Sequence, residues 1–125
     1  MERRLSVRLA RGPTAAGEAR RGLAKLRGDL GAQRMEILSL LVTELVTNSV
    51  KHSRADTILL TVLVGTSAVR TEVTDAGPGF DPAKMGPLSS DHTGWGLFLV
   101  ERLADRWGVN RNGSGTKVWF EIGLA

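Results

Sequence analysis

The strands expected in this 125-residue chain come in hairpins, and this feature most restricts the folds that it can adopt. Residues 57–64 are β-branched and apolar, a short turn of glycine, threonine and serine follows, and residues 68–74 alternate as a returning strand. A second hairpin is expected from residues 107–111 to residues 116–122. A doubly wound parallel sheet needs a helix between successive strands, so the pattern argues against it.

Three helical segments and one more strand complete the pattern. Residues 5–10 alternate as a first strand, residues 15–26 are rich in alanine, arginine and leucine, and residues 33–52 form the longest periodic segment. A helix over residues 94–106 follows a long loop, and glycines in residues 28–31 should separate the first two helices. The order β-α-α-β-β-loop-α-β-β predicts an α+β fold, a two-layer sandwich with a mixed, mostly antiparallel sheet and helices on one face.

The composition narrows the setting and the partners. With 42% hydrophobic residues the chain can bury a core, and we expect residues 1–125 to form a single domain. No apolar run reaches the ~18 residues of a membrane span, and the absence of cysteine suits the reducing cytoplasm. The net charge of +4 favours anionic partners, but aromatic residues do not interleave with the basic ones, so direct nucleic-acid binding is not expected.

The helix over residues 33–52 carries a polar row inside its apolar arc. Glu44, Asn48 and His52 are four residues apart and share one row. Burying a carboxylate and an amide costs free energy unless they find partners. Glu44 suits a general base, and the amide oxygen of Asn48 suits Mg²⁺. A hydrogen-bonded polar layer without a ligand is the alternative, and His52 could simply complement the helix dipole.

An aspartate at the end of the strand over residues 68–74 is the second candidate. Asp75 continues the parity of Val73 and should therefore point to the covered face of the sheet. Its carboxylate could accept a hydrogen bond from an exocyclic amine such as that of adenine. Gly77 and Gly79 would allow close approach of a ligand. A turn in which the aspartate binds its own backbone is the alternative.

A glycine-rich segment opens the last expected helix. Thr93, Gly94 and Gly96 would expose backbone N–H groups at a helix N-terminus, which favours a phosphate group. An ordinary helix cap is the alternative. The preceding connection is long enough to suggest a lid over a nucleotide, with Lys84 and His92 as its cations.

The order of these motifs resembles that of the GHKL (Bergerat-fold) ATPases over nearly the whole chain. Residues 44–52 are similar to the N box of that superfamily, residues 75–79 to its first glycine box and residues 94–97 to its second. Residues 113–116 are similar to its closing Gly-x-Gly-Thr element. The resemblance implies a Bergerat fold with ATP and Mg²⁺ as cofactors.

Within the superfamily, the form of the N box resembles the RsbW-type anti-sigma-factor serine/threonine kinases. The resemblance implies that Glu44 activates the acceptor hydroxyl, that Asn48 holds Mg²⁺ and that Asp75 reads adenine. With the loop cations included, the residues expected to bind the nucleotide are Asn48, His52, Asp75, Gly77, Gly79, Lys84, His92, Thr93, Gly94, Trp95, Gly96, Leu97 and Thr116.

The resemblance also implies partners: a sigma factor, and a STAS-type antagonist that is phosphorylated on serine, with a homodimer as the common assembly. Several such kinases carry an arginine just before the second glycine box, whereas this chain has Asp91-His92-Thr93. Loss of a cationic clamp slows phosphoryl transfer. A nucleotide-dependent binding switch with weak catalysis is therefore the alternative. A histidine kinase catalytic domain is less favoured, because no phosphoacceptor helix precedes the fold.

Overall fold

The sheet is the central element of the molecule. The computed structural model describes residues 2–52, 56–75, 97–112 and 115–124. The sheet has five strands in the order β1-β2-β3-β5-β4, and all four pairings are antiparallel. The expected α+β sandwich is confirmed, with an antiparallel rather than a mixed sheet. The strands are β1 (Arg3–Ala10), β2 (Thr57–Val64), β3 (Ala68–Asp75), β4 (Arg106–Asn112) and β5 (Gly115–Gly123).

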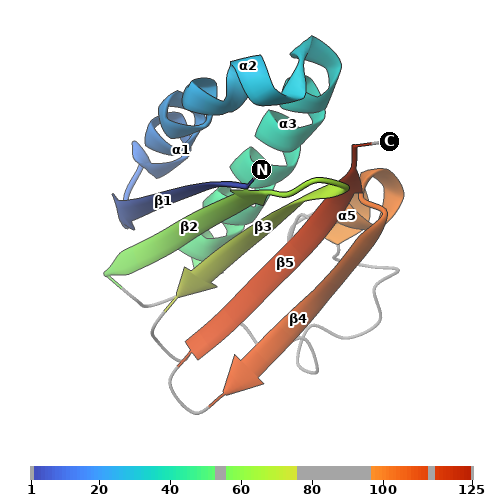
Figure 1. Ribbon diagram of the computed structural model, residues 1–125. Coiled ribbons are helices and arrows are strands. Elements are labelled where there is room, and N and C mark those ends of the chain that lie inside the picture. The colour runs from blue at the N-terminus through green and yellow to red at the C-terminus, as the bar shows by residue number, and fades with distance from the viewer. Residues whose placement is uncertain (1, 53–55, 76–96, 113–114, 125) are drawn as a thin grey trace.

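The helices of the described residues form a second layer on one face of the sheet (Figure 1). The longest helix, α3, contacts β3, while α1 packs between α3 and β1, and α5 contacts α3 and β4. None of the described helices is long and apolar enough to cross a membrane. The helical elements are α1 (Ala15–Leu23), a 3₁₀ turn (Ala24–Leu26), α2 (Arg27–Leu30), α3 (Ala32–His52) and α5 (Leu97–Leu103).

Two helix boundaries differ from the sequence-based expectation. The break predicted over residues 28–31 is confined to Gly31, whose φ of 80° lies in the left-handed region that favours glycine. Gly28 instead lies within α2. The last helix ends at Leu103 rather than at residue 106, because Arg106 begins β4 opposite Glu121.

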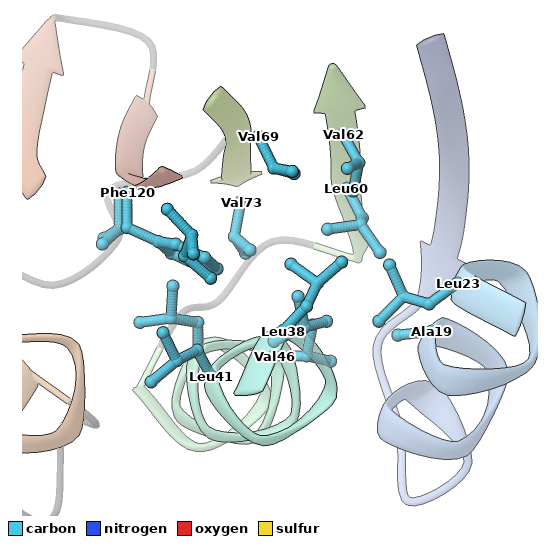
Figure 2. Packing of buried hydrophobic residues seen from close by; sticks show 14 of the residues in the cluster. Ala19, Leu23, Leu38, Leu41, Val46, Leu60, Val62, Val69, Val73 and Phe120 are labelled. Carbon is cyan, nitrogen blue, oxygen red and sulfur yellow. The ribbon is translucent and has the colours of Figure 1, made fainter. Parts of the chain in front are cut away.

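The core lies between the sheet and the helices. Alternate residues of β2, β3 and β5 are buried and face the helical layer, as expected for strands that are covered on one side. Figure 2 shows Leu38, Leu41 and Val46 of α3 packed beneath these strands. Leu40, on the same helix, is 42% exposed.

Candidate functional site

The direction of α3 determines which end of the sheet its polar row approaches. The Arg34 side chain donates to the carbonyl oxygens of Gly123 and Leu124 at 3.2 and 2.7 Å, which fixes the start of α3 near the end of β5. The Nε atom of Arg11 donates to the carbonyl oxygen of Val50 at 3.2 Å, which fixes the last turns of α3 near the end of β1. The C-terminal half of α3 therefore lies at the sheet end where β3 finishes and β5 begins.

Two polar side chains face the helical layer at that end of the sheet. Asp75 is the last residue of β3 and lies directly opposite Thr116 on β5. Each residue is only 2% exposed. The burial of Asp75 agrees with the parity argument, while its role as an adenine reader stays a prediction.

The polar row of α3 descends from solvent into the core. Leu40 is exposed, Glu44 is half-buried and Asn48 is 4% exposed, because each step of four residues rotates the side chain by about 40°. The expectation of a fully buried row is therefore wrong for Glu44, whose carboxylate stays within reach of solvent. Asn48 carries a buried Nδ2 atom with no hydrogen-bond partner in the described part of the chain.

Buried polar groups that the sequence analysis did not propose also occur. Ser49 is 4% exposed beside Asn48, and its position three residues after Val46 could have indicated this burial. Thr71 is fully buried in the middle of β3, and its Oγ1 atom has no hydrogen-bond partner among the described residues. Its place among the core valines separates it from the end of the sheet.

The remaining expected site residues fall into two groups. Leu97 is 2% exposed at the start of α5, and α5 contacts α3. The backbone of His52 ends α3, but its side chain lies outside the described part. The residues that lie wholly outside the described ranges are Gly77, Gly79, Lys84, His92, Thr93, Gly94, Trp95 and Gly96.

The donors at this end of the sheet define its chemistry. They are the amide of Asn48, the carboxylate of Asp75 and the hydroxyls of Ser49 and Thr116 in buried positions, with a second carboxylate nearer to solvent on α3. The described residues contain no group of three or more His, Cys, Asp or Glu side chains that could hold a metal ion. Mg²⁺ in a nucleotide complex is coordinated by waters and phosphate oxygens, and the amide oxygen of Asn48 is a suitable further ligand. Among the described residues, the Nδ2 atom of Asn48 has no partner and could donate to a ligand oxygen.

Comparison with solved structures supports the fold. The chain superposes on the RsbU and RsbW domains of Rv1364c from Mycobacterium tuberculosis with a TM-score of 0.73 and 24% identity, covering 98% of this chain and 32% of that one. A blue-light activated histidine kinase domain from Erythrobacter litoralis matches with a TM-score of 0.58 and 22% identity, covering 87% of this chain and 60% of that one. The chain therefore spans about a third of the first protein and 60% of the second.

Sequence comparison gives the family. An uncharacterized protein of Streptomyces coelicolor is 37% identical over 84 residues, which cover 64% of this chain and 79% of that protein. The model of the histidine kinase-like ATPase domain matches residues 9–122, which is nearly the whole chain. This family implies ATP binding. The chain belongs to the family of histidine kinase-like ATPase domains, within the GHKL superfamily.

Proposed function

We propose that the chain is an Mg-ATP-dependent serine/threonine protein kinase of the RsbW type. One observation carries the proposal: the row on α3 descends from a half-buried Glu44 to a buried Asn48, at the end of the sheet that holds the buried Asp75–Thr116 pair. Because the chain belongs to an ATPase family, a nucleotide is the expected ligand of these polar side chains.

Each side chain takes the role that its burial suits. Asp75, inside the layer, accepts a hydrogen bond from the exocyclic amine of adenine, and Thr116 lines the same end of the pocket. Asn48 offers its amide oxygen to Mg²⁺, which neutralises phosphate charge when bound. Glu44 keeps contact with solvent, so its carboxylate can accept the proton of a serine hydroxyl presented by another protein. The serine oxygen then bonds to the terminal phosphorus as the bond from that phosphorus to the bridging oxygen breaks and ADP leaves.

The partners and setting follow from the resemblance of the motifs and from the likeness of the fold to a structure that contains an RsbW domain. The proposed acceptor is a STAS-type antagonist, and the proposed binding partner is a sigma factor. We place the protein in the cytoplasm and expect a homodimer. These assignments rest on the proposed kinase function.

One observation favours a second function, a nucleotide-dependent binding switch. The sequence before Gly94 reads Asp91-His92-Thr93 and contains no arginine to contact a terminal phosphate. A missing cationic clamp costs about 10³–10⁵ in the rate of phosphoryl transfer in enzymes that use one. Such a protein would bind ATP and a partner but transfer phosphate slowly.

The test is a transfer assay with ATP labelled in its γ-phosphate and a purified STAS protein. We expect labelled phosphoserine with the unmodified chain, and a loss of about 10²–10⁴-fold in rate for Glu44→Gln with ATP affinity retained. The matched control is Glu36→Gln, an exposed glutamate of the same helix, which should change neither quantity.

Other outcomes separate the alternatives. ATP binding without label on serine would support the binding switch, and label on histidine would support a histidine kinase. Calorimetry of Asp75→Asn with ATP and with GTP completes the test, because an adenine reader should lose its preference for ATP. An unchanged preference would contradict the role of Asp75.

A further inference from the structure

The face of the sheet opposite the helices is a second surface with its own chemistry, and we call it the open face. No described helix covers it (Figure 1). The alternation of the strands places five basic and two acidic side chains there, which gives a net charge of +3. These side chains are Arg4, Arg8, Arg70, Arg106, Lys117, Glu72 and Glu121.

The charged groups at the centre of the open face are joined in ion pairs and carry a net charge of +1. Arg70 contacts Glu72 at 3.0 Å and Glu121 at 3.1 Å, Lys117 contacts Glu72 at 3.2 Å, and Arg106 contacts Glu121 at 3.4 Å. Every charged group on β3, β4 and β5 in this area therefore has a partner of opposite sign. The remaining charge of +2 lies on β1, on arginines that form no ion pair with a described residue.

The aromatic ring of the open face is also occupied. The guanidinium carbon of Arg70 lies 4.1 Å from the centroid of the Trp119 ring. The ring packs so closely over Gly108, opposite on β4, that a Cβ atom there would come within 2.7 Å of its Nε1 atom. An indole held in this way is a poor platform for nucleobase stacking.

The edge formed by β1 and β2 has a repeated arrangement, which we call the Arg–Leu edge. Arg4 lies opposite Leu63, and Arg8 lies opposite Leu59. Both arginines are exposed and form no ion pair with a described residue, and Leu59 is 37% exposed. The two Arg–Leu pairs are four residues apart along their strands, which corresponds to about 13 Å.

A hollow of about 140 Å³ marks one end of this edge. It is lined by Arg4, Thr61, Leu63, Arg70 and Glu72. Arg70 and Glu72 in this lining are paired with each other, which leaves Leu63 beside the unpaired Arg4. This combination suits an apolar side chain that is flanked by a carboxylate.

We propose that the Arg–Leu edge docks an acidic, amphipathic helix of a protein partner. A helix rises about 1.5 Å per residue, so carboxylates seven or eight residues apart lie on one face, about 10–12 Å from each other, and their side chains would reach both arginines. Apolar residues between them would contact Leu59 and enter the hollow beside Leu63. This face is opposite the one that carries Asn48 and Asp75, so the proposal does not depend on the nucleotide site.

Charge and contact chemistry favour this occupant over two others. A second copy would bring one net positive open face against another, which is repulsive. Nucleic-acid binding relies on several free cations along a backbone, but only Arg4 and Arg8 lack an acidic partner on the described open face.

The first experiment measures binding of a labelled helical peptide by fluorescence anisotropy, without nucleotide. The peptide has about 18 residues and carries leucines on one face. Glutamates on both sides of these leucines are spaced seven or eight residues apart, so that they lie on the same face. The double variant Arg4→Glu/Arg8→Glu should weaken binding by about tenfold or more. The matched control Arg21→Glu/Arg27→Glu changes two arginines of the helical layer that are also exposed, and it should leave the affinity unchanged.

The apolar part of the proposal needs its own variant. Leu59→Asn keeps every charge but removes an exposed leucine from the Arg–Leu edge, and it should weaken binding while the salt dependence stays the same. Equal weakening by the control pair of arginines would show that the peptide responds only to overall charge, which overturns the proposal.

Three further results would overturn the proposal. One is the absence of peptide binding at about 1 mM. Another is tighter binding of a single-stranded DNA oligonucleotide or of anionic vesicles than of the peptide. The last is a dimer in sedimentation analysis that Arg4→Glu/Arg8→Glu dissociates. Unfolding curves of all variants would establish that they are folded.

Discussion

Two buried polar atoms without partners among the described residues, on Asn48 and Thr71, share a cost but differ in position. A buried group left without a hydrogen bond costs about 1–3 kcal/mol. Asn48 lies in the C-terminal half of α3, at the end of the sheet where Asp75 and Thr116 are buried, whereas Thr71 lies among core valines. A ligand oxygen that accepts a hydrogen bond from Nδ2 of Asn48, such as a phosphate oxygen, would offset the cost there, whereas Thr71 lies away from the proposed site.

This difference in position predicts that removing the polar group abolishes ATP binding at one of the two residues and leaves it unchanged at the other. Asn48→Leu should raise the unfolding free energy of the ligand-free protein by about 1 kcal/mol and abolish Mg-dependent ATP binding. Thr71→Val should raise the unfolding free energy by a similar amount and leave ATP affinity unchanged. Denaturant unfolding and calorimetry provide the two measurements. Full ATP affinity in Asn48→Leu would contradict the proposed metal ligand.

Glu72 on the open face predicts a pH effect on stability. Partial burial would raise the pKa of Glu72, but hydrogen bonds and charges from Arg70 and Lys117 outweigh it and hold that pKa below the usual value of 4.5. Because the folded-state pKa is depressed, the stabilisation is fully present above pH 4.5 and is lost as pH falls through the folded-state value.

The corresponding variant is Glu72→Gln. It should have a lower unfolding free energy than the unmodified protein near pH 7, and the difference should shrink below about pH 4.5. Unfolding in urea at a series of pH values measures it. A difference that stays constant down to pH 2 would show that the ion pairs do not stabilise the fold.

At the residue scale, the sequence correctly predicted which side chains of a strand are buried, because burial alternates along the strand. It did not predict the burial of side chains that depends on the exact rotation of a helix against the sheet. The burial of Asp75 follows from the two-residue period of β3. The half-burial of Glu44 depends on how α3 is rotated against the sheet, which no local pattern specifies. The second glycine box and the lid cations lie outside the described residues, so their roles stay predictions.

The elements themselves were largely predictable because their signals are local. Hairpins follow from alternating strands and short turns, and β2 agrees with its expected range. The connection between α1 and α3 was less predictable, because Gly28 and Gly31 look equally able to break a helix. Only the backbone dihedral angle distinguishes them, since only Gly31 has a positive φ in the described part of the chain.

The two glycines therefore predict opposite stability changes. Gly31→Ala should lower the unfolding free energy by about 1 kcal/mol or more, because an alanine is strained at φ 80°. Gly28→Ala should raise it by about 0.5–1 kcal/mol, because a Cβ atom there meets nothing within 4 Å and α2 gains a better helix former. Thermal unfolding of both variants checks the pair. A stabilising Gly31→Ala would contradict the assigned end of α2.

At the scale of the whole molecule, the proposed nucleotide site draws on both layers and on distant parts of the chain. Asn48 comes from α3, Asp75 from β3 and Thr116 from β5. A ligand held by all three should stabilise the assembled fold as a unit. ATP with Mg²⁺ at about 100 times its dissociation constant should raise the unfolding free energy by about 2.7 kcal/mol.

Differential scanning calorimetry with Mg-ATP, with Mg-GTP and with Mg²⁺ alone measures this effect. Only Mg-ATP should raise the melting temperature of the unmodified chain, and Asp75→Asn should abolish the difference from Mg-GTP. An equal rise with both nucleotides would mean that phosphate contacts alone supply the binding energy.

The order of the strands has a consequence for biosynthesis. β2 with β3, and β4 with β5, are close in sequence and can pair early, whereas β3 and β5 must wait for the whole connection between them. Asp75 and Thr116 face one another only after that late pairing. A nascent chain still on the ribosome thus cannot complete the site until β5 has emerged. Nucleotide binding would then distinguish chains in which β5 has paired with β3 from chains in which it has not.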